Sequence, residues 1–197
     1  MPLTDLVFGL ALSIGAISLI SNKPADPNAV YIAIGGFAFS FLILIQIWFR
    51  FTDIMSVLPV ETAGTRVLNT LLLFLVALEP YLFNTLGAFF VNPQTSGPFA
   101  EVASTIYALD IAAIYAILAL FTNILATEEK KLVAPDLLRS YRASRNLEII
   151  VAVVFLVSAI PQFWTLNIRY FLWATTFFVF RGGSILRWRK RPLAISA

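Results

Sequence analysis

Residues 29–49 read AVYIAIGGFAFSFLILIQIWF and contain no charged side chain. A helix needs about 20 apolar residues to cross the hydrocarbon core of a bilayer, so this stretch predicts a transmembrane helix. The composition agrees, because 59% of the 197 residues are hydrophobic and only 13% are charged, whereas about a quarter of a soluble domain is charged. The chain is therefore expected to be a membrane protein, and a water-soluble or disordered chain is excluded.

Five further apolar segments lie on either side of this stretch. They span residues 3–20, 67–90, 102–127, 149–163 and 168–186. Each is apolar on every face, whereas the strands of a membrane β-barrel alternate apolar and polar residues. We therefore predict an all-α protein with six transmembrane helices in one domain over residues 1–197. Glu79 and Pro80 interrupt the third segment, and the proline is expected to bend or break the helix there.

Lysine and arginine are distributed unevenly over the ends of these segments. With both termini in the cytoplasm, 12 of the 14 basic residues fall on the inner side, and only Lys23 and Arg169 fall outside. Cytoplasmic loops carry such an excess of positive charge, so this orientation is predicted. The basic stretch 128–145 is interpreted as a cytoplasmic loop, with a short interfacial helix against anionic lipid as the alternative.

The sequence contains no cysteine and no histidine. This composition excludes disulfides, thiolate nucleophiles and zinc sites built from these residues. Asp5, Ser13, Glu79 and Asp110 are the reactive groups of the apolar segments, and no base is available to activate the serine. We therefore expect no enzymatic activity, no cofactor and no nucleic-acid partner.

The first segment differs from the others because small residues recur on it at four-residue spacing, which lets neighbouring backbones approach closely. The two pairs are Gly9 with Ser13 and Ala11 with Gly15. A separate stripe of Leu10, Ser13 and Ile17, with Ile14 beside it, would form apolar rings and a hydroxyl ring around the axis of a symmetric oligomer. Periodicity alone favours the simpler alternative, a tightly packed central helix without a pore.

Residues 4–13, TDLVFGLALS, resemble the first-helix signature of the endolysosomal potassium channel family, also called the transmembrane protein 175 family. That signature is Phe-Ser-Asp followed by small and apolar residues and a Thr or Ser. Thr4 stands at the family's Ser and Asp5 at its Asp, which implies that Leu10, Ser13 and Ile17 line the pore. Weaker similarities follow in the next two segments. They involve Trp48, Asn69 within residues 67–73, and residues 77–81.

The resemblance implies a potassium-selective cation channel of the prokaryotic, single-repeat type. It implies a homotetramer with helix one at the centre, set in the lipid bilayer of a prokaryotic plasma membrane as a multi-pass protein, with potassium as the permeant ion. The filter sequence Thr-Val-Gly-Tyr-Gly of ordinary potassium channels is absent. Selectivity is therefore expected to come from the rings of Leu10, Ser13 and Ile17.

Glu79 and Asp110 are additional acids in the spans, expected in the outer half of the membrane, and the family pattern does not explain them. Charged groups at membrane depth are costly unless they are paired or hydrated. Three roles stay open: an outer vestibule that concentrates cations, a proton-coupling pair, or a structural link to Tyr107, Asn84 or Arg169. The second role would make the chain a proton-linked secondary transporter with its site beside an interrupted helix.

Asp5 lies at the start of the first helix, where a carboxylate meets the positive end of the helix and its unpaired N–H groups. One role is helix capping, shared with Thr4. The other, implied by the resemblance, is a charge-dependent lock through Arg66 or a C-terminal arginine that holds the pore stripe in register.

Overall fold

The computed structural model describes residues 2–21, 27–58, 62–91, 98–127, 135–165 and 168–176. Its helices are α1 (Pro2–Ser21), α2 (Pro27–Met55), α3 (Ala63–Val91), α4 (Pro98–Ala126), α5 (Pro135–Ser158) and α6 (Pro161–Thr165). Residues 168–176 are also helical. No strand occurs in these described ranges, which confirms the predicted all-α fold.

Prolines mark where the helices begin. All helices from α1 to α6 except α3 have a proline as their first residue. Proline suits this position because its fixed φ angle is helical and its missing N–H would have no helical partner there. The starting points of these helices are therefore set locally, by the residues at each turn.

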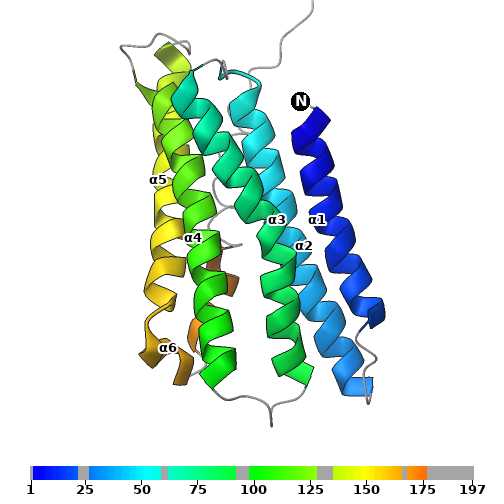
Figure 1. Ribbon diagram of the computed structural model, residues 1–197. Helices are drawn as coiled ribbons and strands as arrows, with labels where there is room; N and C mark the ends of the chain where they lie inside the picture. The colour runs from blue at the N-terminus through cyan, green and yellow to red at the C-terminus, as the bar shows by residue number, and fades with distance from the viewer. Residues whose placement is uncertain are drawn as a thin grey trace, which may run out of the picture.

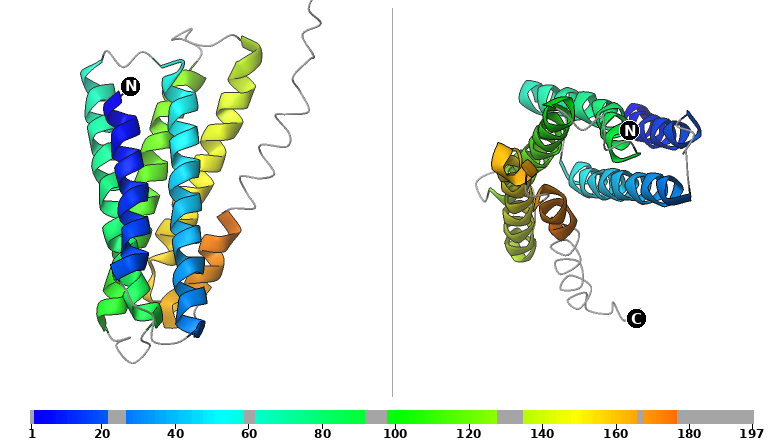
Figure 2. Two further views of the ribbon diagram at one scale, coloured as in Figure 1. Left: turned by 90° about the vertical axis from the view of Figure 1, so that its right-hand side faces the viewer. Right: turned by 90° about the horizontal axis from the view of Figure 1, so that it is seen from below.

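The five long helices run side by side along one bundle (Figure 1). Seen along the bundle, α1 lies at one edge beside α2 and α3, and α5 lies at the opposite edge against α4 (Figure 2). Within a single chain, α1 is therefore a peripheral helix. The prediction that it is central applies only to an oligomer, and the structure of one chain does not test it.

Burial identifies α4 as the central helix of the described bundle. In the apolar 18-residue stretch of each helix, 67% of the residues of α4 are buried, compared with 22% for α2 and 28% for α3. The helices α2, α3 and α4 are long and apolar enough to cross a membrane, and Leu3–Ile17 is a shorter apolar helix. The count of six spans, the single domain and the cytoplasmic termini stay predictions.

The structure tests the bend or break expected at Pro80 and the expected ends of several helices. Pro80 lies inside α3, which continues to Val91 and bends along its length without breaking (Figure 1). Residues 135–145 form the first turns of α5, so both the loop and the separate interfacial helix are wrong for this part. The helix α5 ends at Ser158, just before Pro161, near the predicted end of the fifth apolar segment. The predicted segment 168–186 is helical over 168–176, and its remainder lies outside the described residues.

The described arginines of α2, α3 and α5 lie toward one end of the bundle. The end of α2, the start of α3 and the start of α5 lie together there, beside the start of α1 and the end of α4 (Figure 1). The described arginines of these ends are Arg50, Arg66, Arg139, Arg142 and Arg145. We call this the basic end of the bundle. It is the end that the charge distribution predicts to face the cytoplasm.

Candidate functional site

One face of α1 is apolar and uncovered. Leu10, Ile14 and Ile17 are 58%, 42% and 58% exposed, and Ser13 between them is exposed as well. The opposite face of the helix is packed, since Phe8 and Ala11 are only 2% and 1% exposed. The predicted pore residues therefore share one open surface of the described chain.

This exposed face has the spacing of a coiled-coil seam. Leu3, Leu6, Leu10, Ser13 and Ile17 follow one another at alternating steps of three and four residues. The first three and Ile17 are all more than half exposed. Such a repeat keeps one stripe facing a common axis when helices of several chains pack together.

Ser13 keeps its hydroxyl proton inside its own helix. Its Oγ donates to the carbonyl oxygen of Gly9 at 2.8 Å, a bond that serine often makes to the preceding turn. The oxygen lone pairs are therefore available on the exposed face. A ring of such oxygens offers acceptors to a cation that has shed part of its water.

The two small-residue pairs of α1 behave differently. Ala11 is buried, and a Cβ placed on Gly15 would meet the ring of Phe37 on α2 at 3.5 Å, so this pair lies on the packed side of α1. A Cβ on Gly9 would meet nothing within 4 Å. The close approach expected at Gly9 and Ser13 is therefore not made among the described residues, and that side of α1 is open there.

Asp5 and Trp48 form a hydrogen bond between α1 and α2. The indole Nε1 of Trp48 donates to Oδ1 of Asp5 at 3.2 Å, and Phe8 packs on Phe51 one turn away with ring centroids 6.1 Å apart. The sequence singled out both Asp5 and Trp48 but not their pairing, because they lie 43 residues apart. Thr4 beside them is buried. The C-terminal arginines proposed as partners lie outside the described residues.

Replacing Asp5 by Ala or Trp48 by Phe should each lower the free energy of unfolding. The double variant should reveal a coupling of about 0.5–1.5 kcal/mol, the usual net contribution of one hydrogen bond. Asp5→Asn should keep most of this coupling, since an amide oxygen also accepts from an indole N–H. Unfolding of the four proteins of the cycle in detergent micelles measures it. Strictly additive losses would show that Asp5 acts as a helix cap alone.

Glu79 and Asp110 lie near the middle of α3 and α4, at the 17th and 13th of 29 residues. Both are almost fully buried. Oε1 of Glu79 accepts hydrogen bonds from Ser40 Oγ at 2.8 Å and from the hydroxyl of Tyr107 at 3.3 Å. Its Oε2 and both carboxylate oxygens of Asp110 have no hydrogen-bond partner among the described residues. The link to Tyr107 considered from the sequence is therefore present, and Ser40 was missed.

Arg169 is engaged away from these acids. Its guanidinium donates to the backbone oxygens of Ser158 at 2.6 Å and Ile160 at 3.4 Å, and to the hydroxyls of Ser104 and Thr105. Arginine side chains commonly satisfy the free carbonyls at a helix end in this way. Arg169, predicted near the outer start of the sixth segment, therefore joins the end of α5 to α4.

Arg50 and Glu148 form an ion pair that joins α2 to α5. Nε of Arg50 lies 3.1 Å from Oε1 of Glu148, and Nη2 also donates to that oxygen. The two side chains are 12% and 0% exposed. Sequence reasoning missed Glu148, which lies just before the predicted fifth span.

Asn69 on α3 has an amide oxygen that is buried without a hydrogen-bond partner in the described part of the chain.

These features define a polytopic helical membrane protein with an uncovered apolar face on its first helix. The fold is similar to that in the crystal structure of a lysosomal potassium-selective channel TMEM175 homolog from Chamaesiphon minutus, with a TM-score of 0.66 and 19% sequence identity. The match covers 92% of this chain and 95% of that chain. No protein-family model and no curated protein matches the sequence. The similarity to the transmembrane protein 175 family that residues 4–13 indicated therefore extends to the fold.

Proposed function

We propose that the chain forms a cation channel, selective for potassium, as a homotetramer whose four copies of α1 surround an axial pore. The observation that carries this proposal is the uncovered α1 face, where Leu10, Ser13 and Ile17 are exposed along one seam. A long apolar stripe at the edge of a bundle is suited to pack around an axis. The fold shared with a potassium-selective channel homolog supports the same assignment.

In this channel the rings of Leu10 and Ile17 act as apolar constrictions. Such rings oppose permeation because water leaves a narrow hydrophobic pore readily. The ring of Ser13 between them provides hydroxyl oxygens whose protons are held by Gly9. A potassium ion loses its hydration shell more easily than a sodium ion, so weak oxygen ligands next to a dry constriction favour potassium.

The basic end of the bundle is proposed to face the cytoplasm of a prokaryotic cell, with the channel in the plasma membrane. The end of α2, the start of α3 and the first turns of α5 lie at that end (Figure 1). They carry Arg50, Arg66 and Arg145, and positive charge is retained on the cytoplasmic side during insertion. No catalytic activity is proposed for this channel.

The buried acids favour a second candidate, a proton-linked secondary transporter. Glu79 and Asp110 occupy the middle of their helices, and three of their four carboxylate oxygens have no partner in the described ranges. Transporters place coupling sites at this depth, beside interrupted helices. The uninterrupted course of α3 through Pro80 favours the channel.

Reconstitution of the purified chain into liposomes separates these two functions. We expect passive potassium flux that exceeds sodium flux and does not depend on a proton gradient, from a particle whose mass corresponds to four chains. Ser13→Ala should lower the potassium-to-sodium ratio severalfold, because it removes the hydroxyl ligands. A monomer whose cation transport requires a proton gradient would contradict the channel and support the transporter.

A further inference from the structure

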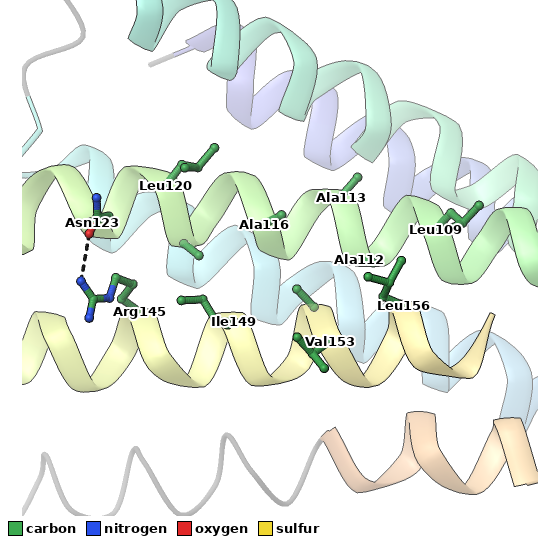
Figure 3. Close-up of a pocket in the computed structure, with 12 residues that line it drawn as sticks. Leu109, Ala112, Ala113, Ala116, Leu120, Asn123, Arg145, Ile149, Val153 and Leu156 are labelled. Carbon is green, nitrogen blue, oxygen red and sulfur yellow. Dashed lines mark hydrogen bonds between the residues drawn. The ribbon is translucent and has the colours of Figure 1, made fainter. Parts of the chain in front are cut away.

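A groove of about 680 Å³ runs along the outer surface of α4 and α5. Short side chains such as Ala113 and Ala116 line it on α4 and leave space between the two helices (Figure 3). Leu109 and Leu156 lie toward one end, and Asn123 and Arg145 lie at the other. The groove is therefore apolar over most of its length and polar at its basic end alone.

Among the described side chains that line this groove, Arg145 is the single charged one. Its Nη1 donates to Oδ1 of Asn123 at 2.9 Å, and its Nε and Nη2 donate to Oδ1 of Asn146 at 3.3 and 3.1 Å. These partners are neutral amides, so they orient the guanidinium, and none of them compensates its positive charge within the described part of the chain. Three of its five N–H groups are used in this way, and two remain for a phosphate.

The dimensions suit one lipid chain. Leu109 and Asn123 are 14 residues apart on α4, which corresponds to about 21 Å along a helix. One leaflet contributes about 15 Å of hydrocarbon, so an acyl chain that starts at Arg145 stays within the groove. The start of α5 continues beyond this level, toward the lipid headgroups.

We infer that the α4–α5 groove binds an anionic phospholipid from the leaflet at the basic end, with an acyl chain along the alanines and the phosphate on Arg145. Charge complementarity selects this occupant over a neutral lipid, because an oriented arginine pairs with phosphate oxygens. The helix α5, which lines the groove together with α4, lies across the bundle from α1 (Figure 2), so packing of α1 around an axis leaves the groove open. The inference requires a bilayer around α4 and α5 and does not depend on channel activity.

Native mass spectrometry of the full chain tests this site. The protein is released from vesicles that contain equal amounts of phosphatidylglycerol and phosphatidylcholine, and the retained lipids are counted. We expect one phosphatidylglycerol per chain to be retained preferentially. Arg145→Gln should weaken this preference about tenfold, which corresponds to about 1.4 kcal/mol. Arg139→Gln, an exposed arginine outside the groove, should leave it unchanged, and Arg145→Lys should restore part of it.

Filling the groove provides an independent measurement. Ala116→Leu adds apolar volume at an exposed position of α4 and should reduce retention of this lipid while thermal stability in detergent is preserved. Equal losses in Arg145→Gln and Arg139→Gln, or retention unchanged in Ala116→Leu, would overturn the site. A change of oligomeric state in Ala116→Leu would assign the groove to a second copy of the chain and would also overturn it.

Discussion

Leu10→Asn should increase potassium flux through the reconstituted protein about tenfold. Leu10 is 58% exposed on the α1 seam, and in the proposed tetramer four copies form the apolar ring next to Ser13. Asparagine is similar in size and keeps water in the constriction, so it lowers the dehydration barrier without widening the pore. Lowering a barrier by about 1.4 kcal/mol accelerates passage about tenfold. Single-channel recording or liposome efflux measures the change.

Ile106→Asn is the matched control for this experiment. Ile106 is a 44% exposed apolar residue of α4, and it belongs to no part of the proposed pore. Its replacement should leave potassium flux unchanged. Equal flux from Leu10→Asn and the parent, or the same increase in Ile106→Asn, would remove α1 from the pore.

Glu148→Ala should destabilise the protein by about 3–5 kcal/mol, the range for leaving one member of a buried ion pair alone. Arg50 is 12% exposed, and Glu148 on α5 is its ion-pair partner. Glu148→Gln should cost less, since the amide oxygen still accepts from the guanidinium. Combining Glu148→Leu with Arg50→Met should recover much of the loss, because no charge is then left buried. Reversible unfolding in detergent measures each variant.

Arg139→Ala provides the surface reference for these values. Arg139 is an exposed residue near the start of α5, and substitutions at such positions usually change stability by less than about 0.5 kcal/mol. A loss in Glu148→Ala no larger than that of Arg139→Ala would contradict the structural role of the ion pair.

Hydropathy and helical periodicity were enough to predict a helical membrane protein and the positions of most of its helices. Apolar stretches such as residues 29–49 predict spanning helices because hydrocarbon admits a backbone only when its own hydrogen bonds are made. The α1 stripe of Leu10, Ser13 and Ile17 was also visible, since positions three and four apart share one helix face. These properties depend on neighbours in the sequence, and they are present before any tertiary contact forms.

The start of α5 shows where this local reasoning stops. Residues 135–145 carry three arginines, which lower their hydropathy and made a loop the favoured interpretation. In the structure they continue directly into the helix that packs along α4. Helical stability in proteins comes largely from such packing, so the boundary depends on a neighbour that hydropathy does not reveal.

The pairing of the polar side chains could not be predicted from the sequence, because it depends on how the helices pack. Trp48 reaches Asp5 over 43 residues, Ser40 reaches Glu79 over 39, and Arg50 reaches Glu148 over 98. Each pair depends on the rotation and height of two helices relative to each other, and these are set by side-chain packing along their whole length. A sequence indicates that a buried polar group needs a partner, but the partner is chosen by the way the helices pack.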